Sequence, residues 1–176
     1  MNHRDHVNLL RPAIPEPGGT WADLGSGRGA FTLALADLLG PQGVIYSVDQ
    51  EAAALQDQAR ALRRQFPAVT VHTLRDDFTG ALDLPPLNGI VLANSLHFVE
   101  PRLRLAVVLQ IKTLLRPEGR LVVVEYNVDA GNTWVPYPFS YPRWEALARE
   151  AGFGHTELLA TAPSSFLHGF YSAGSW

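Results

Sequence analysis

The segment from Asp23 to Gly29 has the composition of a ligand-binding turn. It reads Asp-Leu-Gly-Ser-Gly-Arg-Gly between an apolar run and a helical pattern, so it would join a strand to a helix. Gly25 and Gly27 would let the backbone turn tightly and let a ligand approach peptide N–H groups without a Cβ atom in the way. The Asp23 carboxylate would repel a pyrophosphate group and attract a cationic ligand. The pattern favours a ligand site over the alternative, an ordinary glycine-rich turn.

Asp49 is the second candidate for ligand binding. It ends the apolar run 44–48, about two dozen positions after the glycine turn begins. A carboxylate at that place can accept hydrogen bonds from both ribose hydroxyls of an adenosine ligand. It would also serve as the N-cap of a helix that begins near Gln50, and one side chain can fill both roles. Together with the turn, Asp49 favours adenosine binding.

Two further segments follow strand-like runs. After the third run come Asp76, Asp77 and Phe78. We expect Asp77 to accept a hydrogen bond from an adenine amino group while Phe78 packs on the ring, with Asp76 as the alternative acceptor. A solvated turn would explain the same residues, because Asp is common in turns. After the fourth run comes the segment 94–99, at the place where an open parallel sheet has its ligand crevice.

These residues must be positioned by alternating strands and helices. Short runs that are apolar on both sides predict strands over 20–24, 44–48, 69–74, 90–93 and 121–125. Apolar residues at helical spacing predict helices over 31–38, 55–66, 107–114 and 144–151. This alternation is typical of a parallel sheet with helical crossovers. The runs 155–160 and 166–173 are too close together for a crossover, so they must pair antiparallel if they pair directly.

We therefore predict an α/β fold built on a seven-stranded, mostly parallel sheet with one antiparallel strand from a C-terminal hairpin. A single domain is expected over residues 1–176, in which 1–19 form an N-terminal extension with a short helix packed on the sheet. In the step from Leu115 to Gly119, which leads into the fifth strand, Gly119 is expected to make the turn.

Composition excludes several classes of protein. The net charge of −3 argues against a protein that wraps nucleic acid. No apolar stretch approaches the roughly 18 residues of a membrane span, and the N-terminus leads into no signal peptide. The lack of cysteine excludes disulfides, thiolate metal sites and a cysteine nucleophile. We expect a cytoplasmic protein without a membrane partner and without a metal site.

In their order and spacing these motifs resemble the class I S-adenosylmethionine-dependent methyltransferases, from about Thr20 to Trp176. The Leu115–Gly119 step and the terminal hairpin are most similar to small-molecule methyltransferases that act in quinone biosynthesis. The resemblance implies a Rossmann-like three-layer sandwich with S-adenosylmethionine as cofactor. It implies these cofactor-binding residues: Asp23, Gly25, Ser26, Gly27, Gly29, Asp49, Asp76, Asp77, Phe78 and Asn94.

The resemblance also implies what some of these residues do. Gly25 and Gly27 would cradle the methionine part of the cofactor, and Asp23 would lie near its ammonium group. Asp49 would hold the ribose. The backbone carbonyl of Asn94 would contact the ammonium group, and His97 would face the substrate.

The implied reaction is direct displacement of a methyl group onto a small-molecule acceptor, which depends chiefly on orientation. A base is needed only if the acceptor atom carries a proton. His97 is the first candidate for this base, because an imidazole titrates near neutral pH, and Tyr126 is the second. The alternative for His97 is packing at the crevice edge or positioning of the substrate.

The segment 127–141 is rich in aromatic residues and proline. We expect it to wall the substrate pocket, with Trp134 and Tyr137 binding a flat or apolar molecule. The alternative is an irregular stretch packed over the core.

Three other functions stay open from the sequence. A non-catalytic S-adenosylmethionine-binding module, or a partner subunit with the same fold, would carry the same motifs. A nicotinamide-dependent oxidoreductase is disfavoured by the glycine spacing and the terminal hairpin. RNA methylation is disfavoured by the absence of a basic arm, and a homodimer is compatible with the sequence.

Overall fold

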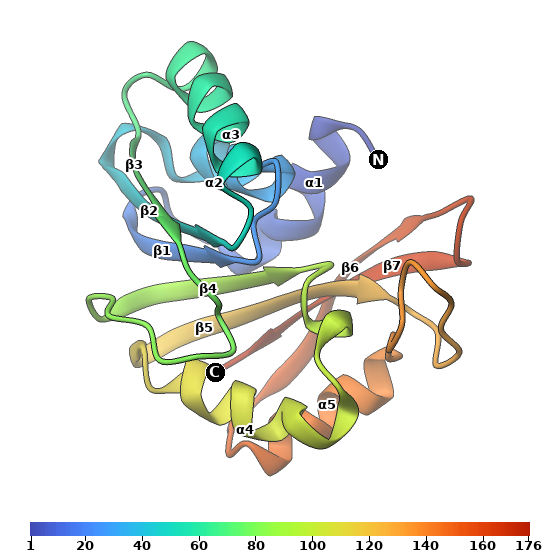
Figure 1. Ribbon diagram of the computed structural model, residues 1–176. Coiled ribbons are helices and arrows are strands. Elements are labelled where there is room, and N and C mark those ends of the chain that lie inside the picture. The colour runs from blue at the N-terminus through green and yellow to red at the C-terminus, as the bar shows by residue number, and fades with distance from the viewer.

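The computed structural model describes residues 1–176 and contains one seven-stranded sheet (Figure 1). Its strands are β1 (Gly19–Leu24), β2 (Gly43–Asp49), β3 (Thr70–Arg75), β4 (Leu87–Ala93), β5 (Leu115–Tyr126), β6 (Thr156–Pro163) and β7 (Gly169–Ser175). They lie in the order β3–β2–β1–β4–β5–β7–β6. Strands β1 to β5 are parallel, and β7 runs antiparallel to both of its neighbours. The predicted α/β fold with its reversed hairpin strand is confirmed.

Helices cover both faces of the sheet, as Figure 1 shows. One layer holds α1 (His3–Leu10), α2 (Ala30–Leu39) and α3 (Ala52–Gln65), and the other holds α4 (Pro101–Lys112) and α5 (Tyr141–Glu150). Short 3₁₀ turns lie at η1 (Arg11–Ala13), η2 (Gly40–Gln42) and η3 (Leu96–Phe98). The expected N-terminal helix is present as α1, which packs on α2 and β6.

The two faces of the sheet carry separate hydrophobic cores. In β5, Leu121 and Val123 pack with the α4 and α5 layer, whereas Val122 and Val124 pack with the α1 and α2 layer. Successive side chains of a strand point to opposite faces, so a run that is apolar throughout is the pattern of a strand covered on both sides. Each fully buried side chain of this kind contributes about 1.5–3 kcal/mol relative to exposure.

One crossover lacks a helix. Residues 76–86 run from β3 to the parallel strand β4 without one, although such connections usually contain a helix. The acidic residues that follow β3 therefore lie on an open loop at the carboxyl edge of the sheet.

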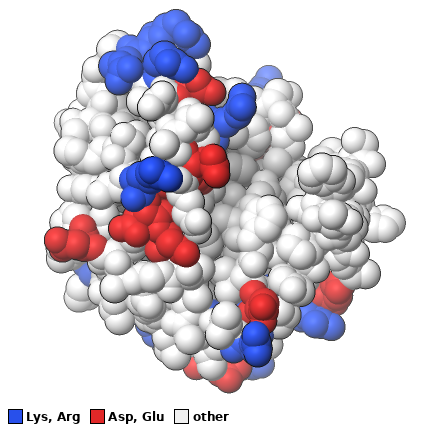
Figure 2. Space-filling model, in the orientation of Figure 1, with Lys and Arg blue, Asp and Glu red and all other residues white.

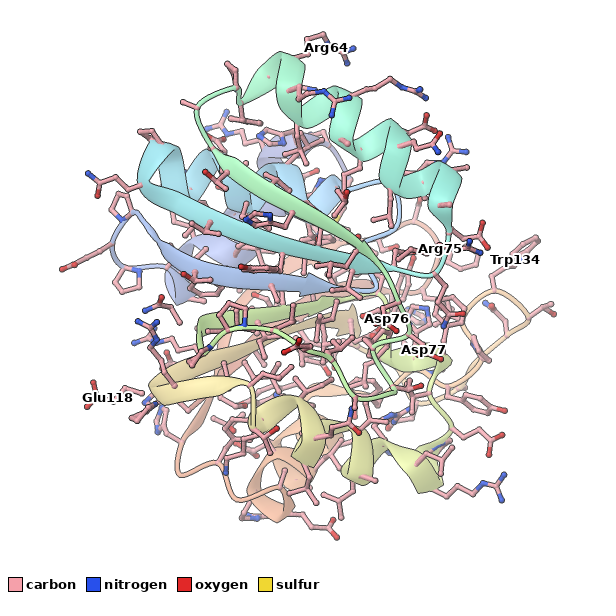
Figure 3. The ribbon with its side chains drawn as sticks, turned by 60° about the vertical axis from the view of Figure 1, so that its left-hand side comes forward. Arg64, Arg75, Asp76, Asp77, Glu118 and Trp134 are labelled. Atoms are coloured by element: carbon pink, nitrogen blue, oxygen red, sulfur yellow. The ribbon has the colours of Figure 1, made fainter.

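The step before Leu121 differs from the prediction. The pairing register of β5 shifts between Leu87 and Gly89, and Glu118 rather than Gly119 has the left-handed backbone, with φ 64°. Gly119 serves a steric purpose, because a Cβ atom there would lie 2.9 Å from the Arg116 carbonyl oxygen. Figure 3 shows Glu118 at the edge of the sheet opposite Asp76, Asp77 and Trp134.

None of the helices has the length and hydropathy of a membrane-spanning segment.

Candidate functional site

The glycine turn joins β1 to α2 and has one open position. Gly25 and Gly27 both have positive φ, at 76° and 53°, which side chains with a Cβ atom rarely adopt. A Cβ atom at Gly25 would lie 2.5 Å from the Cβ of Ser95 and 3.2 Å from the ring of Phe78. At Gly27 no atom lies within 4 Å of that place. Gly25 is therefore required by packing, and Gly27 leaves space through which a ligand can reach the backbone.

Asp49 lies directly against this turn. Its Oδ2 accepts a hydrogen bond from the Gly27 amide at 2.6 Å, and its Oδ1 accepts one from the Glu51 amide at 2.9 Å. Helix α3 begins at Ala52 with Glu51 as its N-cap, so the prediction of Asp49 as the cap is wrong. The carboxylate instead connects the end of β2 to the glycine turn.

Asp23 is buried beneath the turn, with 1% of its surface exposed. Its Oδ2 accepts a hydrogen bond from the Thr32 hydroxyl at 2.6 Å. Burial raises the pKa of Asp23 to about 7, with a smaller upward contribution from the Asp49 charge, while the Thr32 hydrogen bond lowers it. A cationic ligand group nearby would favour the ionised form of this carboxyl group.

A buried hydrogen-bond network supports the turn from α3. Gln58 is fully buried; its Nε2 donates to the Thr32 hydroxyl at 2.8 Å and its Oε1 accepts from the Ser47 hydroxyl at 2.7 Å. The Ser47 oxygen also lies 2.7 Å from the Ser26 oxygen. A Cβ atom at Gly29 would lie 2.3 Å from Cγ of Gln58. This network was not predicted, because Gln58 reads as one more polar residue of an amphipathic helix.

The end of β4 presents two buried polar atoms without a partner. They are Oδ1 of Asn94 and Oγ of Ser95. Asn94 has a left-handed backbone, with φ 53°, and its amide donates to the Val124 carbonyl at 2.9 Å. A buried polar atom without a hydrogen bond costs about 1–3 kcal/mol, so a water molecule or a ligand that bonded to these atoms would be stabilised here. Both atoms lie where the connections of β1 and β4 diverge, which is the ligand crevice of open α/β sheets.

The predicted adenine site is less well defined. Oδ1 of Asp77 accepts from the backbone and the hydroxyl of Thr79 at 2.9 and 2.7 Å, and Oδ1 of Asp76 accepts from the Asp77 amide at 2.8 Å. Both acidic residues are exposed (Figure 3), and Phe78 is half-buried against Gly25. Figure 2 shows a hollow with acidic side chains on the side of α3 and uncharged surface on the side of the β6–β7 hairpin. The roles of Asp76, Asp77 and Phe78 stay predictions.

Across β4 from the turn, His97 and Glu125 form a buried pair. Nδ1 of His97 lies 2.7 Å from Oε2 of Glu125, and the His97 amide donates to Oε1 at 3.1 Å. His97 is 3% exposed and Glu125 fully buried, but Nε2 of His97 has no partner within the chain and is not sealed from solvent. When Nδ1 donates to Glu125, Nε2 is left as a proton acceptor.

The pairing of Glu125 with His97 was not predicted from the sequence. The signal for Glu125 is a single carboxylate at the end of a strand that is otherwise apolar from Leu121 onward. Asn127, two residues later, does not share this site, because its side-chain oxygen accepts from the Tyr141 amide at 2.9 Å.

Aromatic side chains surround the His97 ring. The centroid of Phe98 lies 4.4 Å from that of His97, Tyr126 lies 6.3 Å away, and Phe166 lies 6.1 Å from Tyr126. Phe98 and Phe166 are both more than half exposed. Burial, followed by the Glu125 charge, raises the pKa of Tyr126, so its phenolic proton is held more firmly than usual. Between the two predicted bases, this favours His97.

The aromatic loop, residues 127–140, closes only one side of this region. Within the loop, Val135 and Phe139 are buried, whereas the Trp134 side chain at the tip is 76% exposed (Figure 3). Tyr137 is partly exposed, and its amide donates to the His97 carbonyl at 3.1 Å. Trp134 does not wall a closed pocket, and substrate binding by Trp134 and Tyr137 stays a prediction.

Comparisons with known proteins agree with this geometry. Residues 22–121 match the family model described as "Methyltransferase domain". The chain is 29% identical over 122 residues to carboxy-S-adenosyl-L-methionine synthase of Geobacter sp. (strain M21), covering 68% of this chain and 50% of that protein. It is 25% identical over 176 residues to highly reducing polyketide synthase aurA of Calcarisporium arbuscula, covering 85% of this chain and 7% of the synthase. The chain thus spans half or less of these curated relatives.

Solved structures share the fold. The Burkholderia thailandensis 1,6-didemethyltoxoflavin-N1-methyltransferase, with S-adenosylhomocysteine bound, matches with a TM-score of 0.76 at 18% identity. That match covers 99% of this chain and 77% of the other. Magnesium protoporphyrin IX methyltransferase from Synechocystis PCC 6803, with bound SAM, matches with a TM-score of 0.72 at 14% identity, over 98% of this chain and 76% of the other.

Proposed function

The chain belongs to the methyltransferase-domain family, and on that premise we propose that it binds S-adenosylmethionine and methylates a small-molecule acceptor. The observation that carries the proposal is the placement of two different sites at one edge of the sheet. The glycine turn with Asp49 lies on one side of β4, and the His97–Glu125 pair lies on the other. The Burkholderia and Synechocystis enzymes bind S-adenosylhomocysteine and SAM with the same fold, which supports the cofactor.

The residues at this edge fit the cofactor. Asp49 suits the ribose hydroxyls, and buried Asp23 suits a ligand with an ammonium group. Gly27 leaves the open space that a close backbone contact needs, and Ser95 and Asn94 contribute buried polar atoms without partners. In the proposed site these residues hold the ribose and methionine parts, with Ser26 and Gly29 shaping the turn. Phe78 and one of the two acidic residues beside it hold the adenine.

S-adenosylmethionine, when bound, supplies an electrophilic methyl group, so the protein's main contribution is orientation of the acceptor. His97 takes the proton of an acceptor O–H or N–H at Nε2. Glu125 fixes the imidazole through Nδ1 and stabilises the cation that forms. Tyr126 stays protonated and forms part of the aromatic surroundings.

The acceptor side suits a flat or apolar molecule. Exposed Phe98 lies against His97, exposed Phe166 lies against Tyr126, and the Tyr137 amide donates to the His97 carbonyl. In the proposal Trp134, on the same loop as Tyr137, also contacts the acceptor. The net charge of −3 favours such a molecule over nucleic acid. A cytoplasmic location and a homodimer stay predictions from the sequence.

Calorimetry with S-adenosylhomocysteine and with NAD tests the cofactor. We expect binding of S-adenosylhomocysteine only, weakened at least about tenfold by Asp49→Asn because the ribose contacts are lost. Glu51→Gln, an exposed neighbour, is the matched control. No heat with S-adenosylhomocysteine would contradict the proposal.

Turnover is tested with methyl-labelled S-adenosylmethionine and a panel of phenols and heterocyclic N–H compounds. We expect methylation of at least one of them, lost in His97→Ala, with cofactor affinity retained. Binding without turnover on any acceptor would instead favour the non-catalytic binding module.

A further inference from the structure

Arg104 occupies a position in α4 where an apolar residue is expected. The buried residues of this helix are Arg104, Val107, Val108 and Ile111, which follow the spacing of a core-facing stripe. The Arg104 side chain is only 7% exposed, and its Nε is buried without a partner. Taking a guanidinium group out of water costs several kcal/mol, and an apolar side chain of similar size is often no less stable there. A buried arginine at this position is therefore best understood through the contacts that it makes.

The contacts of Arg104 join two segments that are distant in the sequence. Its Nη2 donates to the Tyr137 carbonyl at 2.7 Å and to the Val99 carbonyl at 3.1 Å. Its Cζ lies 4.3 Å from the centroid of the Phe139 ring. Val99 directly follows η3, which carries His97, while Tyr137 and Phe139 belong to the aromatic loop. The buried Arg104 guanidinium group thus holds the aromatic loop beside the segment that carries His97.

A reciprocal bond completes this arrangement. The Tyr137 amide donates to the His97 carbonyl at 3.1 Å, so Tyr137 is held through both its N–H and its C=O. The far end of the loop is fixed separately, because Asp129 accepts from the Ser140 amide at 2.9 Å and pairs with Arg143 at 3.1 Å. Releasing Arg104 would therefore loosen Tyr137 beside His97, while the two ends of the loop stay joined to each other.

We propose that Arg104 is a positioning residue. It fixes the aromatic loop against the η3 turn and so sets the position of this loop, which would bind the methyl acceptor, relative to His97. The proposal rests on the proposed function only in treating this loop as the acceptor side. The contacts themselves can be tested without an acceptor or a cofactor.

The Tyr137 amide is a specific reporter for the test. Pro136 and Pro138 have no amide hydrogen, so Tyr137 carries the single exchangeable backbone proton of that stretch. We would measure its hydrogen exchange by NMR in Arg104→Met and compare it with the amides of β5. The expected result is exchange at Tyr137 that is at least about tenfold faster, with little change at Val122 and Val124.

Two further variants test the chemistry of the contact. Arg104→Lys should restore part of the protection, because an ammonium group can donate to a carbonyl but does not stack flat on Phe139. Arg102→Met is the matched control, since Arg102 lies on the same helix with its side chain 79% exposed and pairs with Glu100. In Arg102→Met the Tyr137 amide should exchange at the rate seen in the unmodified protein.

Unchanged exchange at Tyr137 in Arg104→Met would overturn the proposal. So would a rise at Tyr137 and in β5 by the same factor, because this is the result of a purely structural role. If Arg104→Met does not fold, Phe139→Leu replaces it and should raise Tyr137 exchange about threefold over β5. S-adenosylhomocysteine binding, measured in parallel, should stay within about twofold in every variant. If the unmodified protein did not bind S-adenosylhomocysteine, the proposed function would be contradicted, but the proposed contacts of Arg104 would not be affected.

Discussion

The imidazole of His97 and the carboxylate of Glu125 meet at 2.7 Å although 28 positions separate them in the chain. Both oxygens of Glu125 bind His97, one through Nδ1 and one through the backbone amide. The carboxylate therefore fixes the orientation of the ring and also the turn that carries it. Within the chain, Nδ1 of His97 is therefore bound, while Nε2 has no partner.

Glu125→Gln should separate orientation of the base from cofactor binding. The amide keeps the size of the side chain, but it removes the charge that stabilises an imidazolium ion, so kcat should fall about 100-fold or more. Steady-state kinetics with an acceptor from the panel measures this effect. Glu100→Gln, at an exposed position near the same turn, is the control. An equal loss of S-adenosylhomocysteine affinity would show that Glu125 supports the whole site and not the base.

Asp23→Asn should make the protein more stable at alkaline pH and weaken cofactor binding. The pKa of Asp23 is raised from 3.8 to about 7, so between these values the folded state binds more protons than the unfolded state. The stability contributed by this group is thus complete below pH 4 and is lost as pH rises through 7. Removing the ionisable group should abolish that decline.

Thermal denaturation at pH 5 and pH 8 measures the stability effect, and calorimetry at pH 8 measures the affinity. The affinity for S-adenosylhomocysteine should fall about tenfold, because a charge beside the ligand's ammonium group is lost. A variant that loses stability at pH 8, or that binds as tightly as before, would contradict this assignment of Asp23.

Two glycine substitutions should affect different properties, one chiefly cofactor binding and the other chiefly stability. Gly27→Ala places a methyl group in open space, so the protein should fold with a strain of about 1–2 kcal/mol and lose S-adenosylhomocysteine binding. Gly25→Ala adds to the same strain a collision with Ser95 at 2.5 Å, so its melting temperature should fall much further. Scanning calorimetry beside binding titration compares them. Binding of S-adenosylhomocysteine that is unchanged in Gly27→Ala would mean that the space at Gly27 is not a ligand space.

Trp134→Ala tests the acceptor side. Since this side chain is 76% exposed, its removal should change neither the melting temperature nor cofactor binding. The acceptor KM should rise several-fold if the indole contacts the acceptor. Leu109→Ala, at an exposed apolar position on α4, is a control for general loss of apolar surface. Unchanged kinetics would remove Trp134 from the site.

The fold was predictable to the extent that it depends on local pattern. Runs that are apolar on both faces indicated the parallel strands, and the short gap near Pro163 indicated the hairpin that reverses β7. The expected burial on both faces is wrong for β3, which lies at the edge of the sheet and is mostly exposed. The position of Asp49 beside the glycine turn followed from the same reasoning, because the carboxyl ends of adjacent parallel strands meet at one edge.

The side-chain pairings were not predictable from local pattern. Glu125 reaches His97 only through the register of β5 on β4, which a single sequence does not reveal. Gln58 and Arg104 are polar residues of helices whose burial was not predicted, because their partners come from distant segments. Gly119 was expected to make the turn, but Glu118 has the left-handed backbone there, and Gly119 is confined by the Arg116 and Leu87 carbonyls.

The reversed strand β7 has a consequence for truncation and fusion. It lies between β5 and β6, so a chain shortened to end before Gly169 would lose an interior strand and leave two unpaired edges where the sheet is now continuous. Because β7 runs opposite to β5, it ends at Ser175, at the amino-terminal ends of the parallel strands, while the glycine turn lies at their carboxyl ends. A purification tag or a reporter domain attached after Trp176 would therefore leave the molecule on the side remote from the proposed cofactor site.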